Sequence, residues 1–393
     1  MNKPLAIGLI IFFILVIAAG AIWLAVRPAP EEAAERGPIL RFPFGLFGGG
    51  EPTEIAPPGV EIGEIPESRL TLLSANPVAG FTIVEDDKRG SMVRWIERQT
   101  GHVFESDSQG KNIERISNTT IPKIFDVVWS MSGKRAVLKY FEGENVRTIS
   151  AEFAATSTKG LILPSNILDI AYAPHRERLL YALPAGAGTR LISADPDNTK
   201  QSEVLTTPFQ EWLINWPTAN IIAFLSRPSG EANGFLFSYD LTQASFSKIL
   251  GDVPGLETLW SPDGKQILYS AYSSSERLPK LFIYNSAKKE GRDLGLKTLV
   301  SKCVFSQTSK EIIYCGIDAN MPAGLYPDDR LKGKISAFDT LWKINLENGE
   351  KNIVGEEVFP DLGQVRISRD DKFLYFTNYV DSSLWSLKLT DGL

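Results

Sequence analysis

The stretch LWSPDGKQILYSAY, residues 259 to 272, places an apolar segment, a tight polar turn and a second apolar segment within 14 residues. Ser, Pro, Asp and Gly are the residues that β-turns favour, and the aromatic residues after them suit a strand. The stretch therefore predicts a β-hairpin. The same order of apolar segment, polar turn and apolar segment recurs along the chain, which makes this hairpin one copy of a repeated unit.

Six such hairpins set the period of the repeat. The anchor residues ahead of their turns are Trp129, Tyr172, Trp216, Trp260, Phe305 and Ile367, at spacings of 43, 44, 44, 45 and 62 residues. A period near 44 is the size of a four-stranded propeller blade. The remaining two strands of a unit are expected as a strand, a polar turn and a shorter outer strand, and SMVRWIERQTGHVF, from Ser91, has this form. It reveals an earlier unit that starts near Val78. The chain is therefore expected to form an all-β, seven-bladed β-propeller.

The two ends of the repeat region predict how the ring closes. The last unit ends at SLWSLKLTDGL without a fourth strand, whereas RLTLLS, Arg69 to Ser74, precedes the first unit. We expect RLTLLS to supply the missing strand, because this would leave no open sheet edge in the ring. The propeller domain would then span residues 69–393.

The turn sequence also carries a family resemblance. Trp260-Ser261-Pro262-Asp263-Gly264-Lys265 resembles the hairpin of TolB-type and WD40-like (PD40) β-propeller repeats of bacterial envelope proteins, and Trp129-Ser130 with Ser132-Gly133-Lys134 matches it in part. The resemblance covers about residues 69–393, although the other copies are degenerate. It implies the fold more strongly than the function, since propellers carry many unrelated tasks. It also implies that the Trp, Asp and Gly residues, and the other anchor residues with them, are structural.

Residues 4–26 form an uncharged apolar segment of 23 residues. At about 1.5 Å per residue, such a helix crosses a hydrocarbon core of about 30 Å. Ala19-Gly20-Ala21 would fit the cleavage site of a signal peptide, but the apolar run continues beyond it, so we favour an uncleaved anchor over residues 1–26. Lys3 before the span favours an N-terminus inside the cytoplasm. The single-pass anchor would then place the propeller outside the cytoplasm.

Residues 27–68 are rich in Pro and Gly and predict a flexible linker. Phe42, Phe44 and Phe47 are unusual within it, because disordered spacers are poor in aromatic residues. Two interpretations remain for these phenylalanines. They pack back onto the domain or lie at the membrane surface, or they form a short docking motif for another protein.

Composition excludes several classes of function. The net charge is −6 with no long basic run, which argues against nucleic-acid binding. No G-x-S-x-G nucleophile elbow occurs. The only histidines, His102 and His175, follow or occupy polar turns and suit solvated positions better than acid–base catalysis. The stretch 194–200, ADPDNTK, lacks the ligand set of a calcium loop. We therefore expect no catalytic histidine, no metal and no cofactor.

The two cysteines of the chain, Cys303 and Cys315, fall on the two strands of one hairpin, each six residues from Ser309 in its turn. This spacing predicts that they lie directly opposite each other on one face of the sheet. An extracytoplasmic location would permit a disulfide. A pair of buried free thiols is the alternative, since cross-strand geometry strains many such bonds.

The one long spacing marks an insertion within residues 317–340, between the second and third strands of its unit. Long loops at 226–234 and 272–280 occupy the same connection in the two preceding units. Three enlarged loops on neighbouring blades would form one binding surface. The alternative is a surface insertion with its own local packing. The candidate contact residues are Tyr326, Asp328, Asp329 and Arg330.

Three functions follow from these observations. We favour a membrane-anchored, extracytoplasmic propeller that binds a protein or an envelope polymer, without enzyme activity, in a cell-envelope assembly. A second hypothesis is a purely structural component of an envelope complex. The enzymatic alternative is a carboxylate-based glycan-active hydrolase or lyase with its site at the central channel. A tight cluster of acids with raised pKa values in that channel would favour the enzyme.

Overall fold

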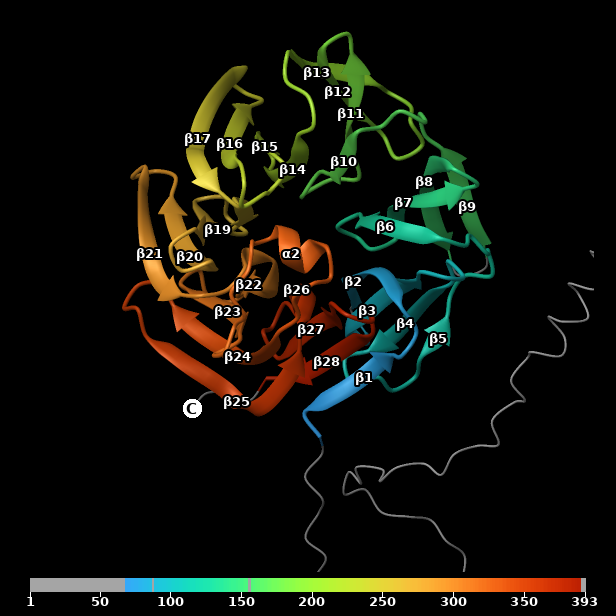
Figure 1. Cartoon of the computed structure of the whole chain (residues 1–393). Helices are drawn as coiled ribbons and strands as arrows, with labels where there is room; N and C mark the ends of the chain where they lie inside the picture. The colour runs from blue at the N-terminus through green and yellow to red at the C-terminus, as the bar shows by residue number, and fades with distance from the viewer. Residues whose placement is uncertain (1–67, 87, 155–156, 390–393) are drawn as a thin grey trace, which may run out of the picture. The chain divides into compact units, whose positions relative to one another are not determined.

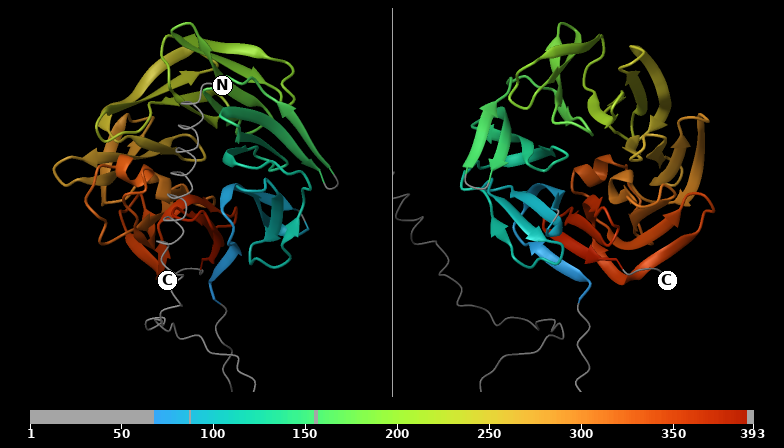
Figure 2. Two further views of the ribbon diagram at one scale, coloured as in Figure 1. Left: turned by 45° about the vertical axis from the view of Figure 1, so that its right-hand side comes forward. Right: turned by 180° about the vertical axis from the view of Figure 1, so that it is seen from behind.

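The computed structural model describes residues 68–86, 88–154 and 157–389 of the chain. They form seven four-stranded sheets around a common centre (Figure 1). A view turned by 45° and a view from behind show the same ring of sheets (Figure 2). The predicted seven-bladed propeller is confirmed.

Each blade is an antiparallel sheet whose strands follow one another from the centre outward. The first three blades contain β2 (Val78–Asp86), β3 (Gly90–Glu97), β4 (Val103–Asp107) and β5 (Glu114–Arg115); β6 (Ile124–Trp129), β7 (Arg135–Glu142), β8 (Asn145–Ala154) and β9 (Ser157–Ile162); and β10 (Asp169–Tyr172), β11 (Leu179–Ala185), β12 (Gly188–Ala194) and β13 (Ser202–Thr207). In blade 1 the Ser91 stretch supplies the second and third strands, so it is not equivalent to the outer strand pair of the later units.

The remaining blades repeat the plan. They contain β14 (Leu213–Thr218), β15 (Ile221–Leu225), β16 (Asn233–Asp240) and β17 (Ser245–Pro254); β18 (Glu257–Trp260), β19 (Gln266–Ser273), β20 (Leu278–Asn285) and β21 (Glu290–Leu296); β22 (Cys303–Phe305), β23 (Ile312–Ile317), β24 (Phe338–Asn345) and β25 (Lys351–Pro360); and β26 (Leu362–Ile367), β27 (Phe373–Asn378) and β28 (Leu384–Lys388). The short helix η1 (Val300–Lys302) lies in the connection between blades 5 and 6, and α2 (Asp328–Leu331) lies between β23 and β24 within blade 6.

Blade 7 closes the ring with a strand from the other end of the propeller sequence. β1 (Leu70–Ser74) pairs with β28 in antiparallel register, with Leu70 opposite Leu387. The backbone N–H of Lys388 also donates to the carbonyl oxygen of Arg69 (2.8 Å). The predicted closing strand is therefore present, and hydrogen bonds rather than chain continuity seal the ring.

Apolar side chains fill the spaces between the blades. Seven buried clusters each combine residues of two neighbouring blades, so every blade contributes to the core on both of its faces. The repeat anchors belong to these clusters: Trp129, Tyr172, Trp216, Phe305 and Ile367 are buried, and Trp260 is partly buried. This placement explains why a bulky residue precedes each turn.

The turn of the quoted hairpin is shaped by its own side chains. Asp263 accepts hydrogen bonds from the Ser261 hydroxyl (2.8 Å) and from the backbone N–H of Lys265 (3.1 Å). Gly264 has a φ of +69°, and a Cβ there would lie 2.2 Å from Cγ2 of Thr218 in the preceding blade. The Asp-Gly pair is thus required both by the backbone conformation and by contact with the neighbouring blade.

No helix within the described residues 68–389 is long and apolar enough to cross a membrane. The predicted anchor at residues 4–26 lies outside the described residues. So do Phe42, Phe44 and Phe47 in the predicted linker.

Candidate functional site

The propeller has two distinct faces. The hairpin turns that follow the innermost strands form one face, which we name the turn face. The connections between blades and the loops between second and third strands form the opposite one, which we name the connection face. The blade 6 insertion, residues 318–337, lies on the connection face, and its helix α2 lies inside the ring of sheets in Figure 1.

The three enlarged loops predicted to gather on this face are joined by hydrogen bonds. The N–H of Gly324 in the insertion donates to the carbonyl oxygen of Arg277 in blade 5 (2.9 Å). Asp328 accepts from the Ser229 hydroxyl (3.1 Å) and from the N–H of Gly230 (2.7 Å), both in blade 4. The insertion is therefore fixed to the two preceding blades.

The four candidate contact residues do not form one exposed surface, and this expectation needs correction. Tyr326 is 1% exposed and Arg330 is 4% exposed. Asp328 is occupied by the blade 4 contacts, and Asp329 accepts from the N–H of Leu325 (2.9 Å) and from Lys334 Nζ (3.3 Å). The alternative of local packing describes this segment better, because its polar groups bind one another and the neighbouring blades.

Arg330 belongs to a buried group of four charges, which we name the inner charge cluster: Lys302, Arg330, Asp339 and Asp361. Arg330 Nη2 lies 2.9 Å from Asp361 Oδ1. Lys302 Nζ lies 2.8 Å from the same oxygen and 2.9 Å from Asp339 Oδ2. Two cations and two carboxylates thus neutralise each other, as buried charges require.

Backbone groups complete this cluster. The N–H of Leu362 donates to Asp339 (2.8 Å), and Arg330 donates to the carbonyl oxygen of Leu362 (2.7 Å). The Arg330 guanidinium also lies over the ring of Tyr379, 3.7 Å from its centroid. The cluster therefore ties the insertion to the connection between blades 6 and 7.

Burial controls the acid–base properties of this region. Desolvation raises the pKa of Asp339, although Lys302 opposes the shift. Glu257, at the start of β18, has its pKa raised to about 7 by burial, with a smaller opposing effect of Arg330. Raised carboxylate pKa values do occur near the channel, but Asp339 and Asp361 are 0% and 1% exposed and already paired. A substrate cannot reach them in this arrangement.

Three large exposed apolar side chains are next in sequence to Arg330 and Asp339 of the inner charge cluster, or to Tyr379, which contacts Arg330. Leu331 follows Arg330, Phe338 precedes Asp339, and Val380 follows Tyr379. Leu331 is 63% exposed, and Phe338 and Val380 are each 69% exposed. We name these three residues the apolar triplet. All three residues belong to segments of blades 6 and 7 on the connection face, so this face exposes large apolar side chains.

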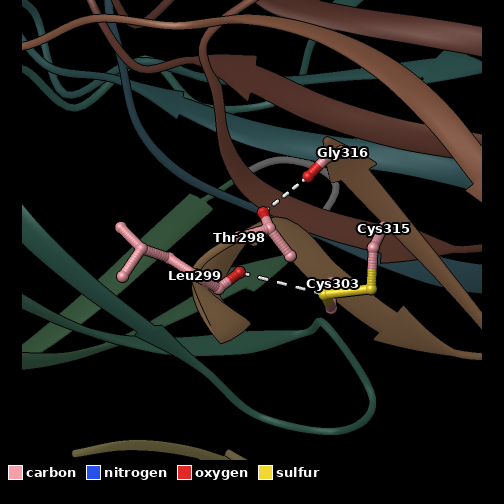
Figure 3. The surroundings of a disulfide bond; sticks show 5 residues. All are labelled: Thr298, Leu299, Cys303, Cys315 and Gly316. Carbon is pink, nitrogen blue, oxygen red and sulfur yellow. Dashed lines mark hydrogen bonds between the residues drawn. A yellow bond between two sulfur atoms is a disulfide. The ribbon is translucent and has the colours of Figure 1, made fainter. Parts of the chain in front are cut away.

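Figure 3 shows the two cysteines and their surroundings, and Cys303 directly follows Lys302 of the inner charge cluster in the sequence. Cys303 on β22 is directly opposite Cys315 on β23, and the two are joined by a disulfide with Cα atoms 4.1 Å apart. The Thr298 hydroxyl donates to the carbonyl oxygen of Gly316 (2.7 Å). Cys303 Sγ lies 3.8 Å from the carbonyl oxygen of Leu299. These contacts fix the connection that carries Lys302 into the cluster.

The other sequence candidates lie in turns. His175 is exposed on the turn face, and His102 Nε2 is 3.2 Å from the Thr120 hydroxyl. In ADPDNTK, Asp195 pairs with Lys200 at 2.9 Å, and Asp197 accepts from Thr199. Among the residues that the structure describes, no three His, Cys, Asp or Glu side chains are grouped to hold a metal ion.

Comparisons with known proteins support the fold. No protein-family model and no curated protein matches the chain. Among solved structures, the chain is similar to an oligogalacturonate lyase in complex with manganese, at 13% identity and a TM-score of 0.52, covering 80% of this chain and 97% of that one. A chain of a mitotic checkpoint complex gives 11% identity and a TM-score of 0.53, covering 91% of this chain and 100% of that one.

TolB from Acinetobacter baumannii gives 14% identity and a TM-score of 0.45, covering 70% of this chain and 65% of that one. At 11% and 13% identity, the likenesses to the lyase and to the checkpoint-complex chain show the fold alone. The structures include enzymes and non-enzymes, so the likeness selects neither class of function.

Proposed function

We propose that this chain is a membrane-anchored propeller outside the cytoplasm that binds a protein partner through its connection face, in an assembly of the cell envelope. The apolar triplet is the observation that carries the proposal. Large side chains of which 63% to 69% is exposed are costly to leave in water, and a protein partner would cover them. The buried ion pairs join the segments that carry these side chains, which helps to hold a binding surface in place.

A protein suits this surface better than an envelope polymer. The triplet presents Leu, Phe and Val side chains, whereas a polar sugar chain requires hydrogen-bonding groups. Well-packed apolar residues at the centre of an interface contribute most of the affinity between proteins. A polysaccharide remains the second outcome of the test below.

The direction of the closing strand supports this assignment of faces. β28 starts at the connection face, and β1 runs antiparallel to it, so Leu70 lies at the turn-face end of blade 7. The chain from the proposed linker, residues 27–68, and the proposed anchor, residues 4–26, joins the propeller there. The chain therefore enters the propeller at the end of blade 7 that lies on the turn face, and the connection face is at the other end of that blade.

The inner charge cluster does not support the glycan-active alternative. An enzyme of that type needs an acid and a nucleophile or base that flank the scissile bond. Asp339 and Asp361 are buried and shared by Lys302 and Arg330, so neither carboxylate is available for that role.

The test is crosslinking and capture from native membranes with the triple variant Leu331→Ser, Phe338→Ser, Val380→Ser. We expect recovery of the specific partner to fall at least about tenfold, since each lost apolar contact costs on the order of 1 kcal/mol or more. The variant should keep the melting temperature of the parent, because these side chains are exposed.

A matched control removes three exposed apolar side chains elsewhere: Ile113, Phe246 and Ile353, each changed to Ser. They lie toward the turn face, so capture should be unchanged. Equal capture by both triple variants contradicts the proposal. Recovery of a polysaccharide and no protein would mean that the partner is an envelope polymer.

A further inference from the structure

The opposite end of the central channel contains a cavity that is unrelated to the inner charge cluster. It has a volume of about 850 Å³ and is lined by the turn-face ends of the innermost strands of blades 1, 2, 5, 6 and 7. Ile83, Leu259, Val304 and Val365 give it apolar walls. Its size exceeds the needs of a small inorganic ion, whereas a segment of polypeptide fits its dimensions.

Arg366, on β26, extends into this cavity. Its side chain is exposed to the channel, and among the described residues it has no hydrogen-bonding or ion-pairing partner. Its guanidinium lies only near the ring of Phe81, 5.8 Å from the centroid. Protein surrounds the channel on all sides, and this desolvation lowers the pKa of Arg366. An unpaired arginine in such surroundings gains more from an anion than one on the open surface.

The other charges of the cavity have the same sign. Lys134 and Arg369 line its mouth, are exposed, and likewise have no ion-pair partner within residues 68–389 that the structure describes. Glu85 is the one carboxylate in the lining, and it accepts hydrogen bonds from the Ser91 hydroxyl at 3.0 Å. Three cations therefore face one carboxylate, in a chain whose net charge is −6.

The backbone of the cavity wall favours a peptide over other anions. β2, β6, β18, β22 and β26 are each the last strand of their sheet on the channel side. An edge strand leaves backbone N–H and C=O groups without a strand partner, and extended peptides bind such edges. The apolar walls would hold the alternate side chains of such a segment.

We propose that the turn-face end of the channel binds an extended acidic peptide segment, with a carboxylate of the segment paired to Arg366 and its apolar side chains against Leu259, Val304 and Val365. The site is on the face opposite the apolar triplet and does not depend on the function proposed for that surface.

The binding test uses the full chain in nanodiscs of zwitterionic lipid, with empty nanodiscs as the blank. The probe is a fluorescein-labelled peptide of about ten residues with alternating Leu and Glu, which spans about 33 Å when extended. Peptides with Gln or Lys in place of Glu are matched controls. Fluorescence anisotropy should show saturable binding of the Leu-Glu peptide alone, weakening as salt rises.

Arg366→Gln should weaken this binding by about tenfold or more, because a hydrogen bond between charged groups is lost. Arg227→Gln, which removes an exposed arginine from the connection face, should leave the affinity within about twofold. The double variant Lys134→Gln, Arg369→Gln should also weaken binding. Both of its side chains are at the surface, so it reports on the site even if Arg366→Gln disturbs folding.

Three results would overturn the proposal. The first is no saturable binding of the Leu-Glu peptide up to about 1 mM. The second is equal weakening by Arg366→Gln and Arg227→Gln, which would indicate general charge attraction. The third is displacement of the peptide by oligogalacturonate of higher affinity, which would assign the cavity to a uronate polymer. Loss of peptide binding leaves capture through the apolar triplet unaffected, so the two proposals fail separately.

Discussion

Arg330 and Arg366 lie at opposite ends of the same channel and differ in their ion pairs and hydrogen bonds. Arg330 is buried, pairs with Asp361, donates to Leu362 and stacks on Tyr379. Arg366 is open to the channel and pairs with no described residue. A charge sealed from water must be neutralised by the protein itself, whereas a charge that water still reaches can be left for a ligand. Arg330 is therefore a structural residue, whereas Arg366 is free to bind a ligand.

The strongest test of this comparison removes the structural arginine. Arg330→Met should destabilise the propeller by about 3–5 kcal/mol, because Asp361 and Asp339 would then share Lys302 alone in a buried site. The free energy of unfolding, from urea titration followed by tryptophan fluorescence, measures the effect. Arg227→Gln is the control and should change it by less than about 0.5 kcal/mol. A variant as stable as the parent would show that the cluster does not need its second cation.

A smaller effect is expected from pH. The pKa of Glu257 is raised from 4.5 to about 7 in the folded protein, so the folded state holds a proton that the unfolded state has lost. This stability is fully present below pH 4.5 and is lost as the pH rises to about 7, by roughly 1–3 kcal/mol. Glu257→Gln should flatten the dependence of the free energy of unfolding on pH within this window. An unchanged slope would show that Glu257 titrates normally.

The smallest effect on stability is predicted for the available arginine. Arg366→Gln should change the free energy of unfolding by less than about 0.5 kcal/mol, since the side chain has no partner to lose. Circular dichroism melting of the parent and the variant measures this directly. A destabilisation as large as that of Arg330→Met would mean that Arg366 is structural, and the comparison between the two ends of the channel would collapse.

The architecture could be predicted because its signals are local and repeated. The turn sequence around Gly264 and the period near 44 residues identify the blades, and the missing last strand points to residues 69–74. The opposition of Cys303 and Cys315 follows from their equal distance to the turn. Each of these inferences needs only the alternation of strand residues and the position of a turn.

The inner charge cluster could not be predicted in the same way. Arg330 and Asp361 are 31 residues apart, and Lys302 and Asp339 are 37 apart, in segments that meet only after the blades are assembled. The charged insertion therefore suggested an exposed contact surface. No local pattern distinguishes an arginine that folds inward onto a distant aspartate from one that faces water.

Arg366 was missed for a geometric reason. It follows Val365 in a strand whose residues alternate between two sheet faces, and the sequence does not indicate that one edge of this strand borders a channel. That information exists only when β26 becomes the innermost strand of its blade. The chemistry of the channel is thus a property of the closed ring.

The closing strand has a consequence for how this protein can be rebuilt. Because Arg69 and Lys388 share a hydrogen bond, the two ends of the propeller sequence are already adjacent. A short peptide could join them, and new termini could be opened in a turn between two other blades, as in a circular permutant. Such a molecule would keep all seven interblade cores while the point of attachment moved to another blade. The blade at which the chain enters the ring would then become a matter of design.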